Sequence, residues 1–197
     1  MRKNREKILR LTITAILTAL IFVLAFTPIG YVKIGPLSIS FLSIPVAVGA
    51  ILGGTYVSTF LGLMFGITSL LQCFGMEPFG TALFTANPFY ATVMCIVPRV
   101  LMGLFCGLIY SGISKTGKKK TAFLVTSFGS GFINTVLFVG FMILLFYRTG
   151  ELAALGDSII AIITALVTVN ALVEWVAATL IGTTVSFAVD KALKSSK

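Results

Sequence analysis

The sequence predicts an all-α integral membrane protein, a bundle of six transmembrane helices in a single domain over residues 1–197, with both termini in the cytoplasm. Of the 197 residues, 57% are hydrophobic and only 11% are charged, and the mean hydropathy is +1.07. That is far more apolar than a water-soluble domain needs to fill its core. A helix that crosses the bilayer takes about 20 apolar residues. The chain therefore fits about five to seven crossings and leaves no room for a soluble catalytic domain.

Six apolar segments follow one another, separated by Gly, Pro and charged residues. The first, 8–26, lacks a convincing signal-peptide cleavage site and is interpreted as a retained helix. The second, 41–52, is broken by Pro45 and is short for a full crossing. The other helices are expected at 55–73, 88–113, 121–147 and 158–189. The last segment is longer than a bilayer requires, so its final turns are expected to tilt or to project into the cytoplasm.

The order of the basic residues predicts the topology. Of the 15 Lys and Arg residues, 12 lie in three clusters beside apolar segments: Arg2, Lys3, Arg5, Lys7 and Arg10; Lys115, Lys118, Lys119 and Lys120; Lys191, Lys194 and Lys197. The links that alternation places outside contain only Lys33 and Arg148 as bases. Translocating basic side chains is unfavourable, so the clusters are expected in the cytoplasm. This clustering explains the net charge of +9 without nucleic acid as a partner.

Polar side chains deep within the predicted helices are the candidates for a binding site, because such groups are costly in lipid unless paired or bound. Arg99 lies about 16 Å below the outer face at 1.5 Å per residue, and Asn134 and Asn170 lie at comparable depths. Glu174 follows Asn170 by one helical turn. Three helices thus present polar groups to one layer, which predicts a pocket that opens outward. The alternative is that Arg99 pairs with Glu174 and that both asparagines cap broken helices.

Weaker candidates lie near the outer surface. Gln72, Asn87 and Tyr90 are placed at the rim of the predicted pocket, where polar and aromatic residues are also common without a function. The segment 31–40 alternates and contains a Gly-Pro turn, so an extended lid is expected there.

Pairs of small residues recur at four-residue spacing: Ala15 and Ala19, Gly49 and Gly53, Gly62 and Gly66, Gly103 and Gly107. Small residues let helices approach closely in lipid, so the glycine pairs are expected to pack helices of this chain together.

No motif in the sequence indicates an enzyme. There is no phosphate-binding glycine loop, no Ser/His/Asp set and no metal-binding pattern, so neither ATP hydrolysis nor a cofactor is expected in this chain. The cysteines, Cys73, Cys95 and Cys106, are isolated along the sequence and are expected to be inert packing residues.

The chain resembles the substrate-binding S components of energy-coupling factor (ECF) vitamin transporters over nearly its whole length. The resemblance lies in the segments 10–19 and 34–54, in Pro98-Arg99 followed by Leu-Met-Gly103, in Asn134-Thr135-Val136, and in Asn170 with Glu174. It implies six helices around an outward-facing vitamin site in a prokaryotic plasma membrane. It also implies a transmembrane coupling subunit, two ATPase subunits, and delivery of the vitamin by toppling of this subunit.

The resemblance assigns roles to particular residues. Ala15 and Ala19 match the small-residue pair that packs on the coupling subunit in this family. The pantothenate-type branch is most similar, with Arg99 facing the substrate carboxylate, although Ser43 stands where that branch often has His. Riboflavin, a pyrimidine vitamin precursor and folate stay open as substrates. A membrane scaffold protein and a solitary channel or carrier are the alternatives from other classes.

Overall fold

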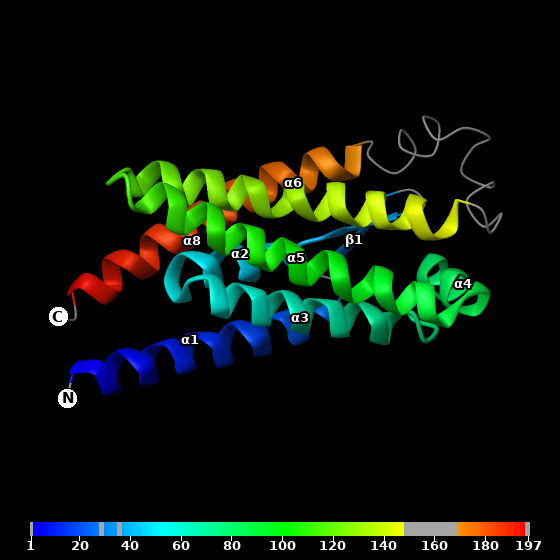
Figure 1. Ribbon diagram of the computed structural model, residues 1–197, viewed down its shortest axis with the longest axis horizontal. Helices are drawn as coiled ribbons and strands as arrows, with labels where there is room; N and C mark the ends of the chain where they lie inside the picture. The colour runs from blue at the N-terminus through cyan, green and yellow to red at the C-terminus, as the bar shows by residue number, and fades with distance from the viewer. Residues whose placement is uncertain (1, 28–29, 35–36, 148–168, 196–197) are drawn as a thin grey trace.

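The computed structural model describes residues 2–27, 30–34, 37–147 and 169–195 (Figure 1). The described residues form seven helices and one hairpin of two antiparallel strands. In chain order the elements are α1 (Arg2–Ala25), β1 (Tyr31–Ile34), β2 (Leu37–Ser40), α2 (Ser43–Gly53), α3 (Thr55–Gln72), α4 (Pro78–Ala86), α5 (Pro88–Ser114), α6 (Lys119–Phe146) and α8 (Val169–Ser195). Five of these helices, α1, α3, α5, α6 and α8, are long and apolar enough to cross a membrane.

The long helices lie where the apolar segments predict them. The predicted segments 55–73 and 88–113 correspond to α3 and α5 within one residue at each end. Helix α1 begins six residues before the predicted 8–26, because the basic start is helical as well. The described helix α8 covers the later part of the predicted 158–189, and residues 158–168 lie outside the described residues.

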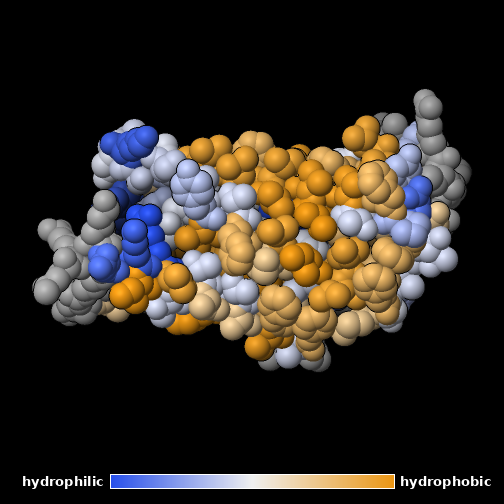
Figure 2. Space-filling model, turned by 60° about the horizontal axis from the view of Figure 1, so that its bottom comes forward, coloured by the Kyte–Doolittle hydropathy of each residue, from blue (hydrophilic) through white to orange (hydrophobic). Residues whose placement is uncertain are grey.

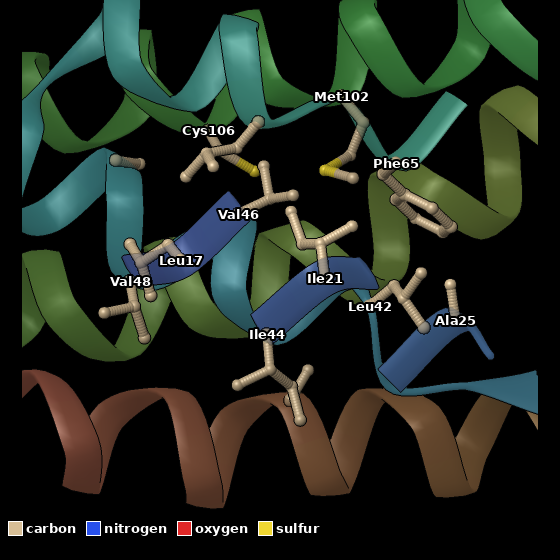
Figure 3. Close-up of a cluster of buried hydrophobic side chains, with 13 residues drawn as sticks. Leu17, Ile21, Ala25, Leu42, Ile44, Val46, Val48, Phe65, Met102 and Cys106 are labelled. Atoms are coloured by element: carbon tan, nitrogen blue, oxygen red, sulfur yellow. The ribbon is translucent and has the colours of Figure 1, made fainter. Parts of the chain in front are cut away.

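The short helix α2 occupies the centre of the bundle. Ten of its 11 residues are buried, and it packs against α1, α3, α5, α6 and α8. Figure 3 shows Ile44, Val46 and Val48 of α2 among buried side chains of the surrounding helices. A helix that is apolar on every face is stable only when protein or lipid covers all of it. The chain itself covers α2, which explains why so short a helix is stable here. The prediction that Pro45 breaks this segment is wrong, because Pro45 lies in the first turn of α2, where the backbone N–H has no helical partner.

Glycines bring α3 and α5 into backbone contact. A Cβ atom added at Gly62 would lie 2.3 Å from the carbonyl oxygen of Arg99, and one at Gly103 would lie 2.2 Å from the carbonyl oxygen of Ser58. No side chain fits at such distances, so the two backbones approach as closely as glycine permits. These contacts confirm the predicted packing role of both glycine positions.

The link predicted at 74–87 is not entirely a loop. It contains α4, whose start is defined by Glu77, the side chain of which accepts a hydrogen bond from Gly80 N, and by Pro78 at the first helical position. Proline suits that position because its missing N–H would have no helical partner. Nine residues are too few for a periodic pattern to be evident.

The hairpin of β1 and β2 corrects the expectation of a purely helical fold and confirms the extended structure predicted at 31–40. Tyr31 pairs with Ser40 and Ile34 with Leu37. Strand β2 lies against α8, a helix that begins more than a hundred residues later.

Both chain ends and the turn between α5 and α6 lie at one end of the bundle (Figure 1). Figure 2 shows hydrophilic residues gathered at this end and a broad apolar zone across the middle of the molecule. The fold therefore brings the described parts of the three basic clusters, at the start of α1, between α5 and α6 and at the end of α8, to the same end. We call this the basic end.

Candidate functional site

A proline in the middle of α5 creates the local geometry around Arg99. Pro98 has no N–H, so the carbonyl of Met94, four residues earlier, lacks its usual helical donor. The Arg99 side chain replaces that donor, with Nη1 donating to Met94 O at 2.7 Å. The Pro-Arg pair thus breaks the helical hydrogen-bond pattern and repairs it with a charged group.

The Arg99 guanidinium is buried between two aromatic rings. Its Cζ lies 5.5 Å from the ring centroid of Phe65 on α3 and 4.4 Å from that of Phe138 on α6. The side chain is only 8% exposed, and Nε has no hydrogen-bond partner among the residues that the structure describes. Cation–π contacts contribute about 2 kcal/mol or more when desolvated. They offset only part of the cost of burying a charge.

Asn134 of α6 and Glu174 of α8 meet in the same region. Asn134 Nδ2 donates to Glu174 Oε1 at 3.1 Å, and both side chains are buried. Within the described part of the chain, the amide oxygen of Asn134 has no hydrogen-bond partner. Ser43, at the start of α2, faces the Glu174 carboxylate, although its hydroxyl does not reach hydrogen-bond geometry.

The alternative interpretation, in which Arg99 pairs with Glu174, is not supported by the contacts of the described residues. The two groups are close enough to interact electrostatically, but no salt bridge joins them, and no other described acid pairs with the guanidinium. The Glu174 carboxylate is held by Asn134 instead. Among the described residues, the buried positive charge therefore has no anionic partner.

The turn of α6 that carries Asn134 is locked against α8. Trp175 Nε1 donates to Thr135 Oγ1 at 3.2 Å. A Cβ atom added at Gly131 would lie 3.1 Å from the Trp175 ring, so a glycine there lets the indole approach. Phe138, one turn after Asn134, reaches Arg99 from the same face of α6. This turn thus connects the groups on α5 and α8.

The rim candidates have local structural roles. Gln72 Nε2 donates to the carbonyl of Ala25 and so ties the end of α3 to the end of α1. Asn87 caps α5, with Oδ1 accepting from Tyr90 N at 3.1 Å. The Tyr90 ring is half-buried and packs edge-on against Phe146. None of these contacts joins the three residues to the layer of Arg99.

Asn170 lies in the first turn of α8, one turn before Glu174, and its side chain is outside the described part of the structure.

Sequence reasoning missed the two aromatic partners of Arg99. Phe138 could have been predicted, because it follows Asn134 by four residues and must share its face of α6. Phe65 could not have been predicted, since only the packing of α3 on α5 brings its ring to the guanidinium.

Two cysteines that are far apart in sequence also meet. The Sγ atoms of Cys73 and Cys95 lie 3.6 Å apart, and both side chains are buried, as is Cys106. The expected burial is confirmed, but the isolation of Cys73 and Cys95 along the sequence does not persist in space. Among the described residues there is no cluster of three or more His, Cys, Asp or Glu that would hold a metal ion.

Comparison with known proteins places these features in a family. The model of the family described as "ECF transporter, substrate-specific component" matches residues 9–186, which include most of α1 and of α8 and every described helix between them. A comparison with curated proteins returned no match. The chain is thus a multi-pass membrane protein of a transport family whose members bind substrate and leave ATP hydrolysis to other subunits. It belongs to the family of substrate-specific components of ECF transporters.

Proposed function

We propose that this chain binds a small anionic vitamin at the layer formed by Arg99, Asn134 and Glu174 and presents it to an ECF coupling module. The observation that carries the proposal is the Arg99 guanidinium, which is buried with a free Nε and without an acidic partner among the described residues. A buried, unpaired charge is unfavourable, and a carboxylate in the site would offset that cost with charge-assisted hydrogen bonds.

Pantothenate is the substrate that we favour. It has one carboxylate for Arg99, and its amide and hydroxyl groups suit the unpaired amide oxygen of Asn134, which accepts hydrogen bonds. Asn170 is assigned to the same layer from its spacing to Glu174. Riboflavin, a pyrimidine vitamin precursor and folate are the alternatives. We also propose that three residues lie at the rim of the site, where each stabilises a helix end: Gln72, Asn87 and Tyr90.

The energy for transport is proposed to come from partners. Ala15 and Ala19 are exposed on α1, so this small-residue pair is free to receive the transmembrane coupling subunit. Two ATPase subunits would act on the cytoplasmic side, and toppling of the loaded subunit would deliver the vitamin inward.

The proposed orientation is six crossings in a prokaryotic plasma membrane, with the basic end in the cytoplasm. It is supported by the gathering of the basic clusters at that end. In this arrangement α2 contributes a partial crossing covered by the other helices. Reporter proteins fused to each terminus test it: both fusions should report the cytoplasm, and an extracellular signal from either end would contradict it.

Ligand identification tests the substrate assignment directly. The chain is purified in detergent, any copurified small molecule is identified by mass spectrometry, and binding of pantothenate and the three alternatives is measured by calorimetry. We expect one of these vitamins to bind, and to be lost in a folded Arg99→Met variant. If none binds more tightly than about 1 mM, the proposal is wrong.

The Arg99→Met variant and an uptake assay on the reconstituted chain separate the other classes of function. A scaffold protein predicts that Arg99→Met impairs folding or assembly with no effect on any ligand. A solitary carrier predicts uphill uptake by the reconstituted chain alone, which a subunit without an ATP site should not perform.

A further inference from the structure

A groove opens at the basic end, between the start of α6 and the end of α8. Its volume is about 580 Å³. It is lined by Lys119, Lys120 and Phe123 of α6 and by Phe187, Ala188, Asp190 and Lys191 of α8. It lies a long way along the helices from Arg99, and neither the substrate nor the coupling subunit has been assigned to it above.

The lining combines positive charge with an apolar floor. Its three lysines are exposed, and Asp190 is the one acid among the described lining residues, so the groove is positive overall. The ring of Phe123 is buried beneath that of Phe187, with ring centroids 4.8 Å apart. Phe187 itself is exposed, so it presents an apolar surface beside the lysines. The groove can thus contact an anion and hydrocarbon at the same time.

The next turns of both helices extend the apolar surface away from the groove. Leu124 and Phe128 of α6 and Ile181 and Val185 of α8 are exposed, in helices apolar enough to lie in lipid. The lysines lie where these helices end, which is the level of the headgroups. A molecule with a phosphate at the groove and hydrocarbon chains along these turns would satisfy both parts of the surface.

We propose that this groove is a binding site for an anionic phospholipid, with the phosphate contacted by Lys119, Lys120 and Lys191. Basic pockets between transmembrane helices at the membrane surface have the chemistry that anionic headgroups require. A soluble acidic peptide would use the lysines but would leave the adjoining apolar turns without a role. A general attraction to negative lipid needs only scattered lysines, whereas here three lysines from two helices converge on one concave site.

Native mass spectrometry of the full-length chain in detergent, titrated with phosphatidylglycerol, measures such a site. Phosphatidylcholine with the same acyl chains is the comparison lipid. The groove variant is Lys119→Gln, Lys120→Gln and Lys191→Gln combined. The control variant, Lys7→Gln, Arg10→Gln and Lys115→Gln combined, removes the same number of exposed charges from the same end.

We expect tighter binding of phosphatidylglycerol than of phosphatidylcholine. The groove variant should lose at least about tenfold in affinity for phosphatidylglycerol, since each lysine near the surface contributes about 1 kcal/mol. The control variant should change less than about twofold, and replacing the three lysines by arginine should retain binding. Thermal melting of each variant shows that it is folded.

Three results would overturn the proposal. Equal losses in both variants would mean a diffuse charge effect. Displacement of the lipid by millimolar inorganic phosphate would mean an anion site without lipid selectivity. Unchanged lipid binding together with lost assembly of the coupling module would make the groove a protein contact. Vitamin binding is measured in parallel and does not depend on the groove, so the two proposals fail separately.

Discussion

Asn134 and Glu174, 40 residues apart in sequence, are joined by a hydrogen bond of 3.1 Å that connects α6 to α8 in the interior of the bundle. The described acid of the interior layer is therefore bonded to Asn134, while the Arg99 guanidinium donates to the Met94 carbonyl. The layer thus contains a hydrogen-bonded carboxylate beside a cation that has no acidic partner among the described residues. That asymmetry is the basis of the proposed anion site.

A double-mutant cycle tests the bond itself. The variants are Asn134→Ala, Glu174→Gln and the two combined, and the measurement is the free energy of unfolding in detergent. We expect a coupling energy of about 1 kcal/mol, because interhelical hydrogen bonds in membrane proteins contribute about 0.6 kcal/mol on average and up to about 1.7. Additive losses would show that the two side chains do not interact.

The Pro98-Arg99 pair of α5 predicts that the stability lost on substituting Arg99 depends on the residue at position 98. Pro98→Ala restores an N–H that can bond to the Met94 carbonyl, which Arg99 otherwise satisfies. We therefore expect Arg99→Met to cost less unfolding free energy in the Pro98→Ala background than in the natural chain, by about 1 kcal/mol. Thermal melting of the four proteins measures this. An equal cost in both backgrounds would contradict the capping role of Arg99.

The close contact of α3 and α5 predicts that one glycine of α5 tolerates no methyl group. Gly103→Ala should destabilise the protein by about 1–3 kcal/mol, since its Cβ would lie 2.2 Å from Ser58 O. Gly112→Ala is the matched control on the same helix, because nothing lies within 4 Å of its Cβ position. That variant should be neutral or more stable, by up to about 1 kcal/mol. Similar losses at both positions would contradict the observed packing.

Cys73 and Cys95 are predicted to cross-link on oxidation. Their sulfur atoms are 3.6 Å apart and need to close to about 2.05 Å to form a disulfide. Cys106 packs in a different group of buried side chains, with Phe65 and Met102. Copper phenanthroline with dioxygen as the final electron acceptor would oxidise the two thiols, which release two protons and two electrons as the disulfide forms. Peptide mapping should find a link between residues 73 and 95 and a free thiol at Cys106. Cross-linking through Cys106 would contradict the arrangement.

Ala15 and Ala19, the exposed small-residue pair of α1, predict that large side chains at these positions stop transport but leave ligand binding unchanged. Ala15→Trp with Ala19→Trp should abolish uptake by the complete transporter, because two indole rings would fill the space that a partner helix requires. Ligand binding by the isolated chain should stay within about twofold of the natural value. The control is Ile16→Trp, an exposed neighbour that already carries a large side chain. Lost ligand binding in the double variant would place this face in the binding site.

Residue order alone predicted much of the framework. The boundaries of α3 and α5 followed from apolar runs that end at Gly, Pro and Asn, and the extended structure at 31–40 followed from alternation, whereas its pairing as a hairpin came from the structure. Helix α4 was missed although Glu77-Pro78 is a recognisable start, because its apolar stretch is too short to show a helical period.

What the sequence by itself determined is the membrane class, the long helices and the grouping of the basic segments at one end of the bundle. These depend on composition and on the order of apolar and basic residues, because lipid accepts only apolar helices and resists translocating charge. The tertiary structure alone decided that α2 lies at the centre of the bundle, that Glu174 bonds to Asn134 rather than to Arg99, and that Cys73 meets Cys95. Those outcomes depend on which helix faces touch and how closely, and spacing along one chain cannot specify contacts between helices.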